Sequence, residues 1–411
     1  MARPDSARTA LGVLTGLNLL NYIDRFIPSA VLPSIIATLH ISDSQAGSLQ
    51  TLFILTYLIV SPFAGWLGDR HPRFRLAAAG VFVWSAATVC SGLAPTFLAL
   101  VLARSLIGVG EASYTVVTPS LLSDFYPPER RSRVLSIFYA AIPVGTALGY
   151  VLGGAIEAKW GWRWAFFIAG APGAALAALL LFLRDPPRGR FDPPGKQAHA
   201  TRTSLGQSLR LLRQRPSYIF NTVAQTIYTF TIGGLAGWMP TYFVRERHLP
   251  LKTADLTFGG VLLLAGFIGT LLGGRLGDRM ARGRRDGYFT MSGWALVLSL
   301  PFILLAVLSP TPAIFWPAMF VTLLLLFLNT GPLNAAMANV LPADLRGFGF
   351  ALYTMSIHLF GDAASPWLIG LASDRVGLKW PVLITGMLLG VSGIVLLLGR
   401  PSLMRDLEPV V

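Results

Sequence analysis

Four ionisable residues interrupt long apolar stretches of this sequence, where a charge is costly. Asp24 and Arg25 interrupt the first stretch, and Arg104 and Glu111 interrupt the fourth. At the centre of a membrane-spanning helix, each such group costs about 2.5–3.5 kcal/mol on insertion scales. The fixed fork of arginine donors suits phosphate or carboxylate, and a carboxylate in a dry site can exchange protons near neutrality. The four residues therefore suit an anionic group and a proton.

The spacing of these residues places them on particular helix faces. Arg104 and Glu111 are seven positions apart, so both project from one face, roughly 10 Å apart along the axis. We expect Asp24 and Glu111 to couple to protons. Arg25 follows Asp24 on the same turn and is the expected counter-charge that an anionic ligand would contest. The alternative is two buried salt bridges that only join two helices, but such pairs stabilise weakly compared with apolar packing.

The second half of the sequence carries weaker polar candidates for ligand binding. Asn221, Gln225 and Tyr228 follow i, i+4, i+7 spacing, and His358 and Asp362 stand four apart, so each set shares one helix face. Polar residues in membrane spans also serve as interhelical hydrogen-bond partners, and the two roles are equally well supported by the sequence.

Composition shows which elements must hold these residues. The chain has 411 residues, of which 54% are hydrophobic and 13% charged, and a mean hydropathy of +0.61. Since a bilayer-spanning helix needs about 20 mostly apolar residues, we expect an all-α integral membrane protein with twelve transmembrane helices. The predicted spans are 10–38, 44–67, 76–94, 97–123, 132–157, 164–183, 217–244, 254–276, 288–308, 312–340, 347–372 and 379–399.

The basic residues indicate how these helices cross the membrane. The net charge is +14, but Lys and Arg gather in the short loops between spans, so they indicate orientation and not nucleic-acid binding. Most fall on one side, which predicts a multi-pass protein of the cell inner membrane with both termini in the cytoplasm. Arg3 and Arg8 precede an apolar run as in a secretory signal, but that run continues past Asp24 without a small-residue cleavage site, so the first span is expected to be retained.

Several classes of function are excluded by what the sequence lacks. The single cysteine, Cys90, allows no intrachain disulfide and no thiolate metal site. No HExxH, GxSxG or glycine-rich phosphate motif is present, and the loops are too short for a catalytic domain. We therefore expect no enzyme activity, no cofactor and no bound metal, and we expect a monomer.

Two halves of the sequence repeat each other. The segment Gly65–Arg70 (GWLGDR) with Arg73 closes the second span, and Gly274–Arg279 (GRLGDR) closes the eighth. A second echo pairs YPPERR at 126–131 with LPADLR at 341–346. Parallel repeats of this kind place a substrate site at the midplane between two six-helix bundles. The predicted bundles are residues 1–183 and 217–411, joined by a cytoplasmic linker at 184–216.

The linker carries an amphipathic segment. Leu205, Leu209 and Leu212 follow helical spacing beside Arg210 and Arg213. This pattern predicts either a short helix on the anionic membrane surface or a solvated basic linker.

These motifs resemble the major facilitator superfamily. The two basic segments match its signature for the loop between the second and third spans. Arg104 with Gly108 and Gly110 is similar to its fourth-span pattern, and residues 143–154 (PVGTALGYVLGG) are similar to its glycine-rich fifth-span signature. The resemblance implies alternating access, with a gating role for Asp69, Arg70, Arg73, Asp278, Arg279, Gly145 and Gly149. The alternatives are a surface ion pair for Asp69 and close helix packing for the glycines.

A narrower likeness concerns residues 21–25 (NYIDR), 108–114 (GVGEASY) and 138–145 (FYAAIPVG), which together resemble the Spinster family. Its members export sphingosine-1-phosphate or lysophospholipids, and proton coupling is implicated for some. The resemblance implies an amphipathic substrate, and the arginines favour an anionic one. We expect it to be bound by Arg25, Arg104, Asn21 and Tyr114, with protons and the lipid bilayer as further partners. A carrier or exporter of small organic anions or drugs is the alternative that the same arginines would serve.

Overall fold

The computed structural model describes residues 4–188, 190–191, 205–341 and 345–407. Within these ranges the chain forms α-helices and one short π-helix, joined by turns and without a strand. The all-α class expected from the sequence is confirmed.

Contacts divide the chain into two compact units. Unit 1 comprises residues 1–196 and 237–260, and unit 2 comprises residues 197–236 and 261–411. Two long helices, α11 (Pro216–Arg247) and α12 (Leu251–Gly283), therefore contribute to both units. The boundaries at 183 and 217 stay predictions.

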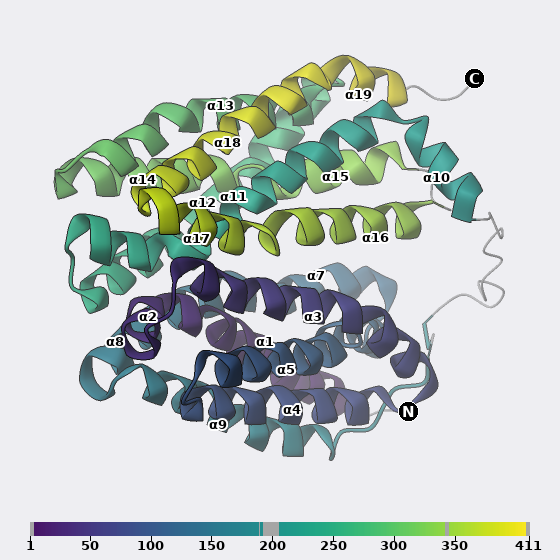
Figure 1. Ribbon diagram of the computed structural model, residues 1–411. Helices are drawn as coiled ribbons and strands as arrows, with labels where there is room; N and C mark the ends of the chain where they lie inside the picture. The colour runs from purple at the N-terminus through teal and green to yellow at the C-terminus, as the bar shows by residue number, and fades with distance from the viewer. Residues whose placement is uncertain (1–3, 189, 192–204, 342–344, 408–411) are drawn as a thin grey trace. The chain divides into compact units, whose positions relative to one another are not determined.

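Unit 1 is built around α4, which packs against α5 and α9, while α1 packs against α8 and α3 against α5 (Figure 1). Its helices are α1 (Pro4–Ala30), α2 (Leu32–Leu39), α3 (Asp43–Arg70), α4 (Arg73–Leu93), α5 (Phe97–Thr115), α6 (Thr118–Phe125), α7 (Pro128–Tyr139), α8 (Ala141–Trp160) and α9 (Trp162–Leu180). This arrangement brings the first and fourth predicted spans, which carry the four ionisable residues, into one bundle.

Unit 2 is built around α13, which packs against α14 and α18 (Figure 1). Besides parts of α11 and α12, it contains α10 (Leu205–Arg213), α13 (Gly287–Leu308), α14 (Pro312–Phe327), α15 (Thr330–Val340), α16 (Arg346–Ile357), the π-helix η1 (His358–Asp362), α17 (Ser365–Val376), α18 (Lys379–Leu398) and α19 (Arg400–Asp406).

Several predicted spans consist of two helices. The first span breaks at Val31 between α1 and α2, and the fourth breaks between α5 and α6. In both cases a proline, Pro33 or Pro119, occupies the first turn of the second helix. Proline lacks the backbone N–H, so it is tolerated in a first turn but interrupts a continuous helix.

Among the described residues, nine helical segments are long and apolar enough to cross a membrane. The predicted spans 10–38, 217–244 and 347–372 are not among them. The first two correspond to α1–α2 and α11, whose hydropathy is lowered by buried polar residues such as Asn21, Asp24 and Asn221. The third is divided by η1 into two helices of 12 residues. These three spans hold most of the polar residues that are candidates for the functional site. A span that is not uniformly apolar therefore indicates where those candidates lie.

Two glycines of α8 allow α1 to approach closely. A Cβ atom on Gly145 would lie 2.8 Å from the carbonyl oxygen of Leu19, and one on Gly149 would lie 2.9 Å from that of Ile23. Any side chain at these positions would push α1 away. The packing role considered for the glycine-rich segment is therefore present, and it fixes the helix that carries Asp24 and Arg25.

The amphipathic segment of the linker forms α10. Leu212 on this helix is 2% exposed and belongs to an apolar cluster of unit 2 with Tyr218, Met337, Leu341 and Tyr353. Part of its apolar face therefore packs on the protein.

Candidate functional site

The four ionisable residues lie on α1 and α5 of unit 1 and are removed from solvent. Asp24 is 2% exposed, Arg104 1% and Glu111 0%, whereas the Arg25 side chain is 20% exposed. Burial of this kind requires partners, because an isolated ion in a dry environment is highly unfavourable. Their contacts therefore indicate what each group can do.

Arg25 pairs with Glu111 and not with its neighbour in the sequence. Its Nη2 atom donates to Oε2 of Glu111 at 2.5 Å. The guanidinium also lies over the rings of Tyr22 and Phe53, each with its centroid at 5.2 Å, and of Tyr57 at 5.6 Å. Such rings stabilise a buried cation through their negative faces. Its ion-pair partner is therefore Glu111, because consecutive residues on a helix point about 100° apart, and the counter-charge effect expected of Arg25 on Asp24 is an electrostatic one without a direct bond.

Asp24 is held instead by α4. Its Oδ2 atom accepts a hydrogen bond from the hydroxyl of Thr88, and its Oδ1 atom has no hydrogen-bond partner. Arg104, Glu111 and Arg25 act on it electrostatically without forming a salt bridge to it. Asp24 is therefore a buried carboxyl group with one oxygen available.

Arg104 retains unused hydrogen-bonding capacity. Its Nη2 atom donates to Gln50 of α3 at 3.2 Å, but its Nε and Nη1 atoms have no partner. Its guanidinium lies over Phe53, 4.8 Å from the ring centroid. Since buried polar groups in proteins are nearly always satisfied, these unpartnered donors indicate a place for an anion.

Other polar atoms nearby share this property. Both amide atoms of Asn21 and the Oε1 atom of Glu111 are buried without a partner. Tyr114 differs, because its hydroxyl donates to the carbonyl of Leu14 at 2.5 Å and its ring packs edge-on against Trp84. Asn21 thus has capacity for a ligand, while Tyr114 joins α5 to α1.

In unit 2, the polar residues of α11 bond to neighbouring helices. Asn221 donates to the carbonyl of Leu333 at 2.9 Å, and Tyr228 donates to that of Leu326 at 3.1 Å. Gln225 is 4% exposed on the same helix. The interhelical role considered from the sequence therefore accounts for Asn221 Nδ2 and the Tyr228 hydroxyl, whereas Oδ1 of Asn221 remains buried and unpartnered.

His358 and Asp362 form a pair at the two ends of η1. The Nδ1 atom of His358 lies 3.1 and 3.0 Å from the two carboxylate oxygens of Asp362. Both side chains are partly exposed, at 33% and 22%. π-Helical turns often occur at functional sites, so this pair remains a candidate in unit 2.

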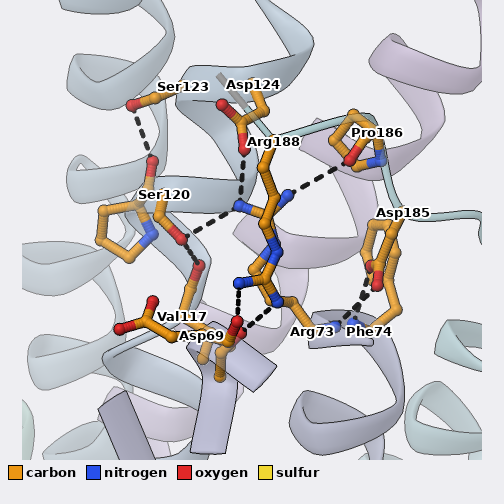
Figure 2. Close-up of polar contacts among 12 residues, drawn as sticks. Asp69, Arg73, Phe74, Val117, Ser120, Ser123, Asp124, Asp185, Pro186 and Arg188 are labelled. Carbon is orange, nitrogen blue, oxygen red and sulfur yellow. Dashed lines mark hydrogen bonds and ion pairs between the residues drawn. The ribbon is translucent and has the colours of Figure 1, made fainter. Parts of the chain in front are cut away.

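The basic segment after α3 is organised by residues that the sequence did not single out. Arg188 donates to the main-chain carbonyl of Asp69 at the end of α3 (Figure 2), and also to the carbonyls of Gly68 at 2.7 Å and His71 at 3.0 Å. Asp185 accepts from the backbone N–H groups of Arg73 at 2.7 Å and Phe74 at 3.0 Å. Both contacts complement the charge of a helix end.

These contacts change the interpretation of the gating residues. The N-terminus of the following helix, α4, is occupied by the carboxylate of Asp185. Arg73 donates to Asp124 at 2.6 Å (Figure 2), and Arg70 lies 4.2 Å from the centroid of Trp66. In the sequence, the acid and the base of the Asp185–Arg188 segment, separated by two prolines, were the signal that could have indicated these contacts.

In the repeat of this segment, Asp278 accepts from the hydroxyl of Tyr288 at 3.0 Å, and Arg279 is exposed.

A second ion pair was also missed. Nη1 of Arg245, in the last turn of α11, lies 2.7 Å from both carboxylate oxygens of Asp43, in the first turn of α3. Both helix segments belong to unit 1. Asp43 stands directly after the Ser42 cap. The sequence around it therefore indicates the start of a helix and does not indicate a partner as distant as Arg245.

Comparison with known proteins places this geometry in a family. Residues 14–366 match the Major Facilitator Superfamily. Human Protein spinster homolog 1 is 36% identical over 397 residues, covering 92% of this chain and 75% of the relative. The zebrafish Sphingosine-1-phosphate transporter SPNS2 is 34% identical over 388 residues, covering 89% and 76%.

Solved structures agree on the fold. A bacterial homolog of the human lysosomal transporter Spinster, crystallised in an inward-facing and unoccupied conformation, superposes with a TM-score of 0.89 at 22% identity and covers 100% of both chains. A D-xylose-proton symporter gives a TM-score of 0.74 at 18% identity, covering 94% of this chain and 96% of its own. The all-helical fold with its ionisable residues on α1 and α5 is thus that of a multi-pass membrane transporter and not of an enzyme, and the chain belongs to the Spinster proteins of the Major Facilitator Superfamily.

Proposed function

We propose that this transporter is a secondary active carrier that works by alternating access, couples transport to protons and moves an amphipathic anionic lipid. The substrate class is a lysophospholipid or a sphingosine-phosphate-like molecule. The single observation that carries the proposal is Arg104, a fully buried arginine with two unpartnered nitrogen atoms beside two carboxyl groups that each keep one oxygen free. The name of the zebrafish relative, a sphingosine-1-phosphate transporter, supports the same substrate class.

The headgroup would bind to arginine. Phosphate accepts several hydrogen bonds, and the guanidinium plane provides donors in a matching fork. Arg104 has Nε and Nη1 available without breaking any existing ion pair. Arg25 is available only if it leaves Glu111, so binding of the headgroup to Arg25 would remove the counter-charge of that acid.

Proton coupling follows from this competition. While Arg25 is bound to Glu111, the carboxylate keeps a counter-charge at 2.5 Å. If an anionic headgroup takes over Arg25, Glu111 is left buried without its cation, and proton uptake then becomes the less costly state. Asp24, with Thr88 as its donor, is the second candidate proton carrier. Coupling needs no further group.

We propose that the end of α3 and the segment after it have a gating role in alternating access. Asp69 and Arg70 end α3, and Arg188 holds the last carbonyls of that helix. We place this end in the cytoplasm, with both termini, in the cell inner membrane of a monomeric protein. Asp278 and Arg279 would have the same gating role at the corresponding end of α12.

The alternative is a carrier of small organic anions or drugs, which the same arginines could serve. Transport assays in proteoliposomes separate the two. A panel of lysolipids, their dephosphorylated analogues and soluble organic anions would be tested with and without a pH gradient. The proposal expects uptake of phosphorylated lysolipids driven by the gradient. Transport of soluble anions alone, or transport indifferent to the gradient, would contradict it.

A further inference from the structure

Asp255 is a buried acid that the proposed function does not use. It lies in the second turn of α12, is 0% exposed, and neither of its carboxyl oxygens has a hydrogen-bond partner. The other buried acids among the described residues each have a donor. These are Asp24 with Thr88, Asp43 with Arg245, Glu111 with Arg25, Asp124 with Arg73, and Asp286 with Arg284. Asp255 is thus the exception within the described ranges.

The surroundings of Asp255 in unit 1 are tightly packed. A Cβ atom on Gly154 of α8 would lie 2.5 Å from Oδ2 and 2.8 Å from Cβ of Asp255. The carboxyl group therefore lies directly against the backbone of α8, and only a glycine fits there. Phe258, one turn further along α12, packs edge-on against Tyr150 of α8, with ring centroids 5.2 Å apart.

The charged group that acts on Asp255 is another acid. Glu157 of α8 interacts with it electrostatically, and Glu157 in turn accepts a hydrogen bond from Ser34 of α2 at 2.6 Å. The phenol of Tyr150 is the other titratable neighbour. From α11, Arg245 is engaged by Asp43, and Phe243 contacts Phe258 with centroids 5.8 Å apart. Among the residues described, no cation balances Asp255.

An ionised carboxylate in this position would be strongly unfavourable. It would lack both a donor and a counter-charge, which costs several kcal/mol for a buried ion, and it would repel Glu157. A hard metal cation would demand about six oxygen ligands, whereas the contact with Gly154 leaves no room on that side. A proton needs neither space nor further ligands.

We propose that Asp255 is a second proton-binding site, and that its proton allows the start of α12 to pack on α8 at Gly154. Loss of that proton would place a bare carboxylate between Glu157 and an apolar contact, so the first turns of α12 would separate from α8. The contact is therefore a pH-dependent one. The proposal goes beyond the function above, because Asp24, Glu111 and the arginines take no part in it.

Infrared spectroscopy tests for the proton directly. The carbonyl stretch of a protonated carboxyl group is distinct from that of a carboxylate and shifts in D2O. At neutral pH, we expect the purified protein to show such a band that disappears in Asp255→Asn and persists in Asp24→Asn and Glu111→Gln. No difference between the wild-type and Asp255→Asn spectra would overturn the proposal. A band that is abolished by added sodium would also overturn it in favour of a cation site.

Spin-label distances test the contact. Ala158→Cys on α8 and Thr253→Cys on α12 are exposed positions, to be labelled in a Cys90→Ser background. We expect the short-distance population to fall as the pH rises, to stay high in Asp255→Asn, and to be low at every pH in Gly154→Ala. Glu246→Gln, another acid of unit 1, serves as the matched control and should follow the wild type.

The two proposals fail separately. If the pH response of the α8–α12 distance persists in the Asp24→Asn, Glu111→Gln double variant, the Asp255 site stands whether or not those residues couple transport. If Asp255→Asn responds to pH as the wild type does, or if the wild type does not respond at all, the Asp255 proposal is overturned and the proposed function is unaffected.

Discussion

Arg25 donates to Glu111 at 2.5 Å, so the arginine adjacent to Asp24 in the sequence is bound to an acid of another helix. The pair connects α1 to α5, and Glu111 is fully buried while Arg25 is 20% exposed. A headgroup that contests Arg25 would therefore free Glu111 first. This relationship and the other contacts of unit 1 lead to five predictions.

The first prediction concerns the ion pair itself. Glu111→Gln leaves Arg25 without its counter-charge, and we expect a loss of about 3 kcal/mol in the free energy of unfolding, at the lower end for a broken buried pair because three aromatic rings still contact the cation. The double variant Arg25→Met, Glu111→Leu should recover most of that stability but not transport. Thermal unfolding in detergent and proteoliposome uptake measure the two quantities. Recovery of transport in the double variant would reduce the pair to a structural role.

The second prediction concerns Arg104. Replacing it with Gln removes the charged donors but keeps a polar side chain, so binding of a phosphorylated lysolipid should weaken roughly 10- to 100-fold, as expected for hydrogen bonds to a charged group. Binding of the dephosphorylated analogue should change little. Titration calorimetry or fluorescence binding with both ligands gives the comparison. Equal losses for the two ligands would mean that Arg104 is structural.

The third prediction concerns Asp24. Asp24→Asn mimics the protonated carboxyl group and keeps an acceptor for the Thr88 hydroxyl. We expect substrate binding to remain measurable while transport loses its dependence on the pH gradient. Uptake with and without an imposed gradient checks this. A normal response in the variant would transfer the proton-coupling role to Glu111, for which Glu111→Gln is the next test.

The fourth prediction concerns Arg188. Arg188→Ala removes donors to three carbonyl groups at the end of α3, so we expect a loss of about 1 kcal/mol, a small value because the contact is exposed. Arg184→Ala, an exposed arginine of the same segment, is the matched control. Cysteine labelling near Asp69 should increase in the first variant only. Identical behaviour of the two variants would show that Arg188 does not hold the end of α3 in place.

The fifth prediction is a pH dependence in the loop before α13. Burial raises the pKa of Asp286, but hydrogen bonds from Arg284, Arg400 and Thr290 outweigh it and lower the pKa from 3.8 to about 2. Because the folded-state pKa lies below the unfolded value, Asp286 stabilises the fold above about pH 4, and this contribution is lost as the pH falls toward about 2.

Asp286→Asn should therefore lower the free energy of unfolding by about 2 kcal/mol at neutral pH. The difference from the wild type should vanish near the folded-state pKa. Asp278→Asn changes the same charge at an exposed carboxylate and should show a smaller effect. Thermal unfolding at several pH values measures this, and a constant difference across the range would contradict the assigned contacts.

The sequence by itself determined the class of protein and the residues of interest. Runs of apolar residues must be buried in a bilayer, and a charge within such a run must face the protein interior, so Asp24, Arg25, Arg104 and Glu111 could be selected without a structure. The repeated GxLGDR segments predicted two related halves. Proline positions could also have predicted the breaks within the first and fourth spans.

Only the tertiary structure decided which groups meet. Partner choice depends on which helices are neighbours and how each is rotated about its axis, and neither is encoded in local spacing. Arg25 therefore reaches Glu111 across 86 positions, and Asp24 finds Thr88 on α4. Arg188 contacts the end of α3 from a segment that the sequence predicted to be a linker. Asp255 was invisible for the same reason, since its lack of a partner is a property of the packing between α12 and Gly154 and not of its own sequence.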